Sequence, residues 1–364
     1  MKKILIFSHE FPPDVGGAGV VAKQNADALS HLGYNVTVLT RRQEFCLNSN
    51  KYQILYVKCT GKLWFLSYKN SVNFESYDII FLNDPASIYV AGLFFDKKTL
   101  SKSLVFLQGT EPESIYIKPK LSMKLSFFKY FYTKALYNCK SIIAISNFMK
   151  EKFIEQTKLT DLSKKIIVNY AGIDTNLFYQ EKDEKLRIQN NINASQQILL
   201  SVSRVVKQKG YFDMADIFKE LILQDENYIW IIVGDGSDLE SLKIYIKDLA
   251  LEKFVIFEGS KTREELRNYY SNADVFWLLS KFDESFGLVY LEAQACGCPA
   301  IGRNNAGVKE AINDGKSGFL INNENEILDI LSSKKYLKLK QEDILGFASK
   351  FSLDIQIKNL EKII

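Results

Sequence analysis

The stretch KKILIFSHEFPPDVGGAGVVAKQNADALSHLGYNVTVLT, residues 2–40, decides the fold. Its apolar start, 4–7, has the pattern of a buried strand, and a loop with several glycines follows. An amphipathic helix then continues to Leu29 and ends at Gly33, and 35–40 forms the next strand. Strand, glycine loop, helix and strand are the first unit of a doubly wound parallel sheet.

The same alternation recurs along the chain and begins anew after a polar stretch at 174–197. We therefore expect an α/β protein with two Rossmann-like domains, at 1–175 and 196–345, joined by a polar linker. Further strands are expected at 78–82, 104–107, 141–145, 165–168, 198–202, 229–233, 254–257 and 275–279, and later helices at 211–223, 239–250 and 263–272. The final segment, 351–364, has apolar residues at helical spacing and is expected to pack through that stripe.

Composition fits a globular protein of two ordinary domains, with 364 residues of which 47% are hydrophobic. No apolar run approaches the roughly 20 residues of a membrane-spanning helix, and the run at 4–7 is too short for a signal peptide, so we expect a cytoplasmic protein. The 5 cysteines have no metal-like spacing and there are only 2 histidines. Reduced thiols and no metal site are therefore expected.

Charge is distributed unevenly along the chain. Residues 1–175 carry 23 Lys and Arg against 14 Asp and Glu, whereas the remainder has 24 against 29. Within the basic half, 116–140 interleaves lysines with aromatic residues and suggests one basic, aromatic helix that lies on an anionic membrane surface. A partly buried helix with a solvated lysine face stays open as the alternative. Nucleic acid is a poor partner because no recognised binding module accompanies the charge.

The segment FDESFGLVYLEAQACGCPAIG, 282–302, carries the strongest chemical signal. It reads as a loop that turns into a helix at Gly287, with Glu284 at the helix start and Glu292 about two turns further along. Amides at a helix N-terminus form an anion site, and here they belong to Phe286, Gly287, Leu288 and Val289. A carboxylate on each side of such a site suits a nucleotide sugar. A surface helix with two solvated glutamates is the alternative.

Three other places should contribute to the same site. Gly17 lies in the early glycine run 16–19, before a helix whose amides can meet phosphate. Arg204 and Lys209 follow a predicted strand and can neutralise a leaving diphosphate in place of a metal, unless they belong to an ordinary solvated loop. Two strand-end loops, beginning at Gly234 and at Phe257, are positioned to enclose a nucleobase.

These motifs together resemble the retaining glycosyltransferases of family 4, which have the two-domain GT-B fold. The resemblance covers nearly the whole chain: FSHEFPPDVGGAGVVA at 7–22, SVSRVVKQKG at 201–210, IVGDGSDLESL, FEGS and ESFGLVYLEAQACGCPAIG. It implies that Gly17 approaches the donor phosphates, that Arg204 and Lys209 hold the diphosphate, and that the closing helix returns to the first domain.

The resemblance also implies roles in the acidic segment. Glu284 would bind a hydroxyl of the donor sugar and Glu292 the ribose hydroxyls, while the amides of 286–289 would hold the sugar and the distal phosphate. Many members of the family have His-Gly at the end of a first-domain strand, where the His contacts the donor sugar. This chain has Gln108 there, which would contact the donor but cannot titrate. A second departure is NNAGVKE at 304–310. His9 and Glu111 are weaker candidates for acceptor contacts.

We therefore expect a metal-independent, retaining hexosyltransferase that uses a UDP- or GDP-linked sugar and no cofactor. Its acceptor would be a lipid-linked or growing surface glycan, such as O-antigen, capsule or lipopolysaccharide, at the inner face of the cell membrane. Two alternatives remain: a GT-B nucleotide-sugar epimerase, which should show more titratable groups near the sugar, and a non-catalytic membrane-associated partner subunit. Base, sugar, linkage and oligomeric state are not fixed by the sequence.

Overall fold

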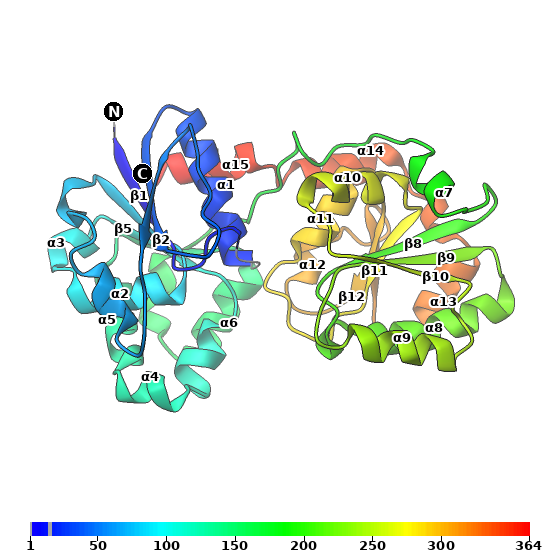
Figure 1. Cartoon of the computed structure of the whole chain (residues 1–364), viewed down its shortest axis with the longest axis horizontal. Helices are drawn as coiled ribbons and strands as arrows, with labels where there is room; N and C mark the ends of the chain where they lie inside the picture. The colour runs from blue at the N-terminus through cyan, green and yellow to red at the C-terminus, as the bar shows by residue number, and fades with distance from the viewer. Residues whose placement is uncertain (1, 14–16) are drawn as a thin grey trace. The chain divides into compact units, whose positions relative to one another are not determined.

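A computed structural model describes residues 2–13 and 17–364 and shows two compact units. The first contains the described residues up to Ala171 together with Leu353–Ile364, and the second is Gly172–Ser352. Each unit has one sheet in which all strand pairs are parallel (Figure 1). The expectation of an α/β protein with two parallel sheets is confirmed.

The sheet of the first unit has seven strands in the order β3-β2-β1-β4-β5-β6-β7. These are β1 Lys3–Phe7, β2 Asn35–Arg41, β3 Gln53–Val57, β4 Ile79–Leu82, β5 Ser103–Leu107, β6 Ser141–Ala144 and β7 Ile166–Val168. Its helices are α1 Gly17–His31, α2 Pro85–Phe94, α3 Lys97–Leu100, α4 Leu121–Leu125, α5 Phe128–Asn138 and α6 Asn147–Thr157, with short turns η1 Trp64–Tyr68, η2 Phe74–Ser76, η3 Pro112–Ile117 and η4 Thr160–Lys165. The central strands are buried along their length, as a parallel sheet covered on both faces requires.

The sheet of the second unit has six strands in the order β10-β9-β8-β11-β12-β13. These are β8 Gln197–Val202, β9 Tyr228–Val233, β10 Val255–Gly259, β11 Val275–Leu278, β12 Ala300–Arg303 and β13 Gly318–Ile321. Its helices are α7 Lys185–Gln189, α8 Tyr211–Gln224, α9 Leu239–Asp248, α10 Arg263–Asn272, α11 Leu288–Ala295, α12 Val308–Ala311, α13 Glu324–Ser332 and α14 Gln341–Ser349, with η5 Lys207–Lys209 and η6 Lys335–Lys338. Helices α8 and α9 cover one face of this sheet, and α10 and α11 the other (Figure 1).

The last helix, α15 (Leu353–Glu361), belongs to the first unit, as the sequence led us to expect. Ile357 and Leu360 join the core that α1 forms with the sheet. A buried hydrogen bond of 3.0 Å from Gln356 Nε2 to Asn25 Oδ1 ties α15 to α1. The chain thus enters the second unit once and returns, and α15 completes the first unit's core.

Two expectations about local structure were wrong. The polar stretch 174–197 is not a free linker, because Phe178 and Leu186 are buried in the second unit and Glu181 N donates to Ser271 Oγ at 3.1 Å. The basic stretch 116–140 is not one helix either. It divides into the end of η3, α4 and α5, with a break at Phe127, whose φ is 51°. No helix in the described part of the chain has both the length and the apolar character needed to cross a membrane.

Candidate active site

Three loops at the carboxyl ends of β8, β9 and β10 are joined by backbone contacts in the second unit. Gly234 N donates to Gly259 O at 2.8 Å, and Val205 N donates to Asp235 O at 2.9 Å. A side chain at Gly234 would bring its Cβ to 1.9 Å from Ser203 O, so only glycine allows this approach. The predicted Gly234 and Phe257 loops therefore lie beside the loop that carries Arg204. This edge of an open parallel sheet is where such folds bind ligands.

The two predicted cations on the β8–α8 loop have different surroundings. Arg204 is exposed, and its guanidinium forms no hydrogen bond or ion pair with any other described residue. Lys209 Nζ lies 2.5 Å from Glu284 Oε1, and both side chains are mostly shielded, with 17% and 16% of their surfaces exposed. The structure thus brings Lys209 and Glu284 together, although 74 residues separate them in the chain. It leaves Arg204 available to an anion.

Helix α11 begins directly after the glutamate loop. Its N-terminal residue is Leu288, and the preceding Gly287 has φ 100° and ψ 56°, a left-handed conformation that favours glycine. The amides at Gly287, Leu288 and Val289 are the ones that have no acceptor within a helix. Phe286, by contrast, buries its ring against Phe351 at a centroid distance of 5.4 Å, which anchors the loop. The residues of the predicted anion site therefore lie in an anchored loop at the start of a helix.

The loop 304–310, which departs from the family pattern, supports this segment. Gly307 N donates to Glu284 O at 2.8 Å. A Cβ at Gly307 would lie 2.5 Å from Ser285 O, so the two loops are in direct backbone contact. Sequence reasoning missed Gly307 as a support for Glu284. A glycine in the loop between β12 and α12 was the available signal.

Glu292 is buried, unlike the solvated glutamate of the alternative interpretation. Arg263 Nη2 donates to Glu292 Oε1 at 2.7 Å, and the Tyr270 hydroxyl donates to Oε2 at 3.3 Å. Burial raises the pKa of Glu292 from its ordinary value of 4.5, and Arg263 and Tyr270 only partly oppose this. Each carboxylate oxygen can accept a further hydrogen bond, such as one from a hydroxyl of a ligand. Sequence reasoning missed Arg263 and Tyr270, although Arg263 begins the helix after the β10 loop.

A third carboxylate, Glu258, lies at the end of β10. Glu258 accepts from Asn190 Nδ2 at 3.1 Å and from the Tyr269 hydroxyl at 2.9 Å, and it pairs with Lys261 at 3.0 Å. Burial alone would raise the pKa of Glu258, but the bonds from Lys261, Tyr269 and Asn190 outweigh it and lower the pKa. Glu258 is therefore ionised and holds the loop next to Gly259.

Gln108 follows β5 in the first unit. Its Nε2 donates to Asn83 O at 3.0 Å and to Asn83 Oδ1 at 3.2 Å. Asn83 is 1% exposed and is itself fixed through Nδ2, which donates to Ser8 Oγ and Ala18 O. Both amide protons of Gln108 are thus directed at Asn83. The remaining group, Oε1, is the one with which Gln108 can contact a ligand.

Glu111 has a structural position rather than the acceptor contact suggested by the sequence. It is 1% exposed, and its two oxygens accept from Gln108 N and Gly109 N at 2.6 Å each. Buried Lys152 lies near the same loop, pairing with Glu113 at 2.7 Å. Because both Glu111 oxygens face the loop, Glu111 holds Gln108 in place, and we do not propose an acceptor contact for it.

His9 and Gly17 complete the predicted set. His9 lies among aromatic rings, with Nδ1 2.9 Å from the Tyr68 hydroxyl and its ring 4.7 Å from the ring of Trp64. Gly17 is the exposed first residue of α1, and a Cβ there would meet nothing within 4 Å. Part of that helix start is occupied by protein, because Gly19 N donates to Glu10 Oε1 at 3.2 Å. Gly16 of the same run lies outside the described residues.

Among residues 2–13 and 17–364, no three His, Cys, Asp or Glu side chains lie close enough together to hold a metal ion.

Both units match known sequence families. Residues 15–177 match Glycosyltransferase Family 4, and residues 182–341 match Glycosyl transferases group 1. The chain is 26% identical over 325 residues to N-acetyl-alpha-D-glucosaminyl L-malate synthase of Bacillus anthracis, covering 85% of this chain and 81% of that protein. It is 23% identical over 343 residues to alpha-monoglucosyldiacylglycerol synthase of Streptococcus pneumoniae, covering 89% and 76%.

Solved structures share the fold. The crystal structure of Anabaena HepE in complex with UDP-glucose has a TM-score of 0.79 and 19% sequence identity to this chain, covering 100% of this chain and 99% of HepE. Both sheets, the returning C-terminal helix and the two consecutive family matches agree with the GT-B fold. The chain therefore belongs to the glycosyltransferases, with a Glycosyltransferase Family 4 sequence in its first unit and a Glycosyl transferases group 1 sequence in its second.

Proposed function

We propose that this glycosyltransferase is a retaining, metal-independent hexosyltransferase that moves a sugar from a UDP- or GDP-linked donor to a lipid-linked or growing surface glycan such as O-antigen, capsule or lipopolysaccharide. The observation that carries the proposal is the ion pair between Lys209 and Glu284 at the start of α11. This pair brings a cation and a carboxylate together next to the start of α11, and in our proposal the carboxylate binds the donor sugar.

Each group has a role in this proposal. Exposed Arg204, Lys209 and the amides of 287–289 hold the diphosphate and stabilise the charge that develops on it. Glu284 orients the donor sugar through a hydroxyl, and Glu292 holds the ribose. Two cations then provide the charge neutralisation that a metal ion provides in other transferases.

The reaction follows from that arrangement. The bond from the anomeric carbon to the diphosphate oxygen breaks, and its electron pair leaves with the phosphate. The acceptor hydroxyl oxygen bonds to the same carbon from the same face, so the anomeric configuration is retained. Its proton passes to the departing phosphate oxygen. No protein base or covalent glycosyl-carboxylate is needed, in contrast to the paired carboxylates of retaining hydrolases.

The relatives support the choice of donor and acceptor. HepE was crystallised with UDP-glucose, and the Streptococcus pneumoniae relative is named for a glycosylated diacylglycerol. For this chain we propose a donor of the same class and an acceptor at the inner face of the cell membrane.

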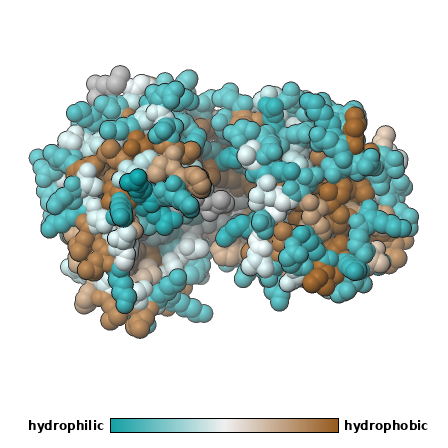
Figure 2. Space-filling view, viewed as in Figure 1, coloured by the Kyte–Doolittle hydropathy of each residue, from teal (hydrophilic) through white to brown (hydrophobic). Residues whose placement is uncertain are grey.

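The basic stretch 116–140 is the surface that we propose for membrane contact. Three apolar side chains of α4 and the residues after it are largely exposed, Leu121 at 71%, Leu125 at 72% and Phe127 at 69%. Figure 2 shows hydrophobic surface at the end of the first unit where Figure 1 places α4. Lysines flank these residues in the sequence, a combination that suits an anionic bilayer surface.

A transfer assay tests the proposal. Purified protein is incubated with labelled UDP- and GDP-hexoses and a lipid extract, with and without EDTA, and the configuration of the product is read by NMR. We expect one donor to label the lipid fraction with the donor's anomeric configuration, unchanged by EDTA. Inverted product would contradict retention, and loss of activity in EDTA would contradict metal independence. Epimerisation of the donor without transfer would favour the epimerase alternative.

A further inference from the structure

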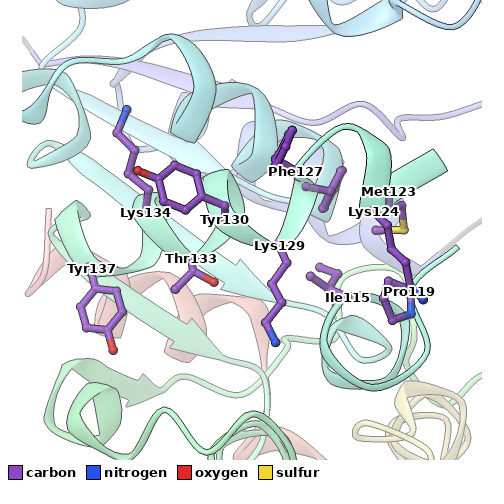
Figure 3. Close-up of a pocket in the computed structure, with 11 residues that line it drawn as sticks. Ile115, Pro119, Met123, Lys124, Phe127, Lys129, Tyr130, Thr133, Lys134 and Tyr137 are labelled. Carbon is purple, nitrogen blue, oxygen red and sulfur yellow. The ribbon is translucent and has the colours of Figure 1, made fainter. Parts of the chain in front are cut away.

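An apolar groove lies between η3, α4 and α5 in the first unit. Its volume is about 630 Å³, within the range of ~300–1,000 Å³ that is typical of small-molecule sites. Figure 3 shows Ile115, Pro119 and Met123 on one side of it and Phe127, Tyr130 and Thr133 along the other. None of the residues assigned above to donor binding lines the groove.

The groove offers few hydrogen-bonding groups to an occupant. Thr133 Oγ1 and the Tyr116 hydroxyl are 2.7 Å apart and bond to each other, and the Tyr137 hydroxyl donates to Asp161 at 3.0 Å. Lys134 Nζ donates to Gly92 O at 2.8 Å. A peptide in this groove would leave its backbone amides unpaired, which is costly. A hydrocarbon chain has no such requirement.

The charged residues that line the groove are all lysines. No Asp or Glu occurs in residues 114–150, which contain 7 lysines. Lys124 and Lys129 line the groove, and Lys129 Nζ lies 5.0 Å from the centre of the Tyr116 ring rather than against a carboxylate. An apolar channel bordered by cations is complementary to a chain that ends in an anionic group.

We propose that this groove binds the prenyl chain of a prenyl diphosphate, the lipid part of the acceptor, with Lys124 and Lys129 facing the diphosphate. The identification of this lipid as an acceptor rests on the proposed function. Its binding does not, because the groove needs neither donor nor sugar transfer to be occupied.

Calorimetric titration of the full chain with farnesyl diphosphate, below its micellar concentration, tests the proposal. We expect saturable binding of one molecule per chain, and clearly weaker binding of farnesol and of inorganic diphosphate. Met123→Trp, which fills the groove, should abolish binding. Lys124→Gln with Lys129→Gln should weaken it roughly 30-fold, since a cation near an anionic lipid contributes about a fivefold change.

Two matched controls locate the binding. Leu121→Ser with Leu125→Ser removes exposed apolar side chains outside the groove and should leave farnesyl diphosphate binding unchanged while weakening adsorption to vesicles. Arg204→Ala should also leave farnesyl diphosphate binding unchanged. That result would exclude binding of the diphosphate at the donor site. Thermal melting of each variant verifies the fold, and the lysine pair provides the test if Met123→Trp does not fold.

Absence of saturable binding, equal binding of farnesol, or equal binding by the lysine variant would overturn the proposal. Tighter binding of dihexanoyl phosphatidylglycerol would also overturn it and assign the groove to a two-chain lipid. If farnesyl diphosphate does not bind but lipid labelling succeeds, the groove proposal fails and the proposed function stands. If farnesyl diphosphate binds but no donor labels the lipid fraction, the groove proposal stands and the transferase role is contradicted.

Discussion

Glu111 holds the loop after β5 by accepting the amide protons of Gln108 and Gly109. Glu111→Ala leaves the buried Gly109 amide unpaired, so we expect the free energy of unfolding to fall by about 1–3 kcal/mol. Burial raises the pKa of Glu111, which means that its charged form is costly in the folded protein. Removing this charge therefore offsets part of the lost stability. Denaturant unfolding measures the change. Glu151→Ala, an exposed change on α6, is the control, and equal stability of the two variants would contradict the structural role.

The raised pKa of Glu292 predicts that nucleotide binding depends on pH. Its carboxylate form accepts hydrogen bonds from Arg263, Tyr270 and, in the proposal, ribose. Because burial raises the pKa of Glu292 above 4.5, affinity should be complete above this raised pKa and decrease as the pH falls through it. The measurement is the Kd of the bound nucleoside diphosphate against pH. Glu292→Gln, which does not titrate, should remove this inflection and leave only that of the phosphate; an unchanged profile would exclude Glu292.

At the scale of elements, the start of α11 depends on the conformation of Gly287. An alanine there would adopt φ 100° and place its Cβ 2.8 Å from the Tyr290 ring, so Gly287→Ala should cost about 1–3 kcal/mol and weaken nucleotide binding. Gly346→Ala, within α14 and with nothing within 4 Å of the new Cβ, should instead stabilise by about 0.4–1 kcal/mol. Thermal unfolding and calorimetry report both. Equal effects of the two changes would contradict the claim that the backbone conformation at Gly287 requires glycine.

The elements η3 and α4 carry the prediction for membrane contact. Replacement of Lys118, Lys120 and Lys124 by Gln removes three exposed cations, each contributing about 1 kcal/mol near an anionic surface, so partitioning should weaken roughly 100-fold. Sedimentation with phosphatidylglycerol vesicles at low salt measures it. The matched control replaces exposed Lys62, Lys97 and Lys98 in the same unit and should change partitioning far less. Equal losses would indicate net charge rather than a defined surface.

At the scale of the whole molecule, the sequence predicted both sheets because their strands have strong apolar runs and clear glycine turns. It did not predict β3, β12 or β13. The edge strands β3 and β13 have half-buried residues and therefore a weak pattern, and β12 has only 4 residues. The single helix expected at 116–140 was wrong because a left-handed residue, Phe127, interrupts a continuous basic and aromatic pattern. Phe178 and Leu186 were overlooked in a polar stretch because two isolated apolar residues have no periodicity.

The candidate site could be predicted where a local sequence motif carries the functional residues. Glu284, Lys209 and the start of α11 come together as the sequence led us to expect. Arg263 and Tyr270 could not be assigned, because their contact with Glu292 arises from the packing of α10 on α11. Glu111 was assigned to the acceptor because its burial beneath the loop depends on tertiary structure.

The central claim is that the strand-end cluster of the second unit binds a nucleoside diphosphate. Calorimetric titration of the protein with UDP, GDP, ADP and NAD tests it most directly, together with Lys209→Ala, Glu292→Ala and, as controls, exposed Lys207→Ala and Glu264→Ala. We expect one diphosphate to bind, both site variants to weaken it at least tenfold while remaining folded, and both controls to bind normally. Absence of binding by all four nucleotides, or binding of NAD alone, would contradict the account.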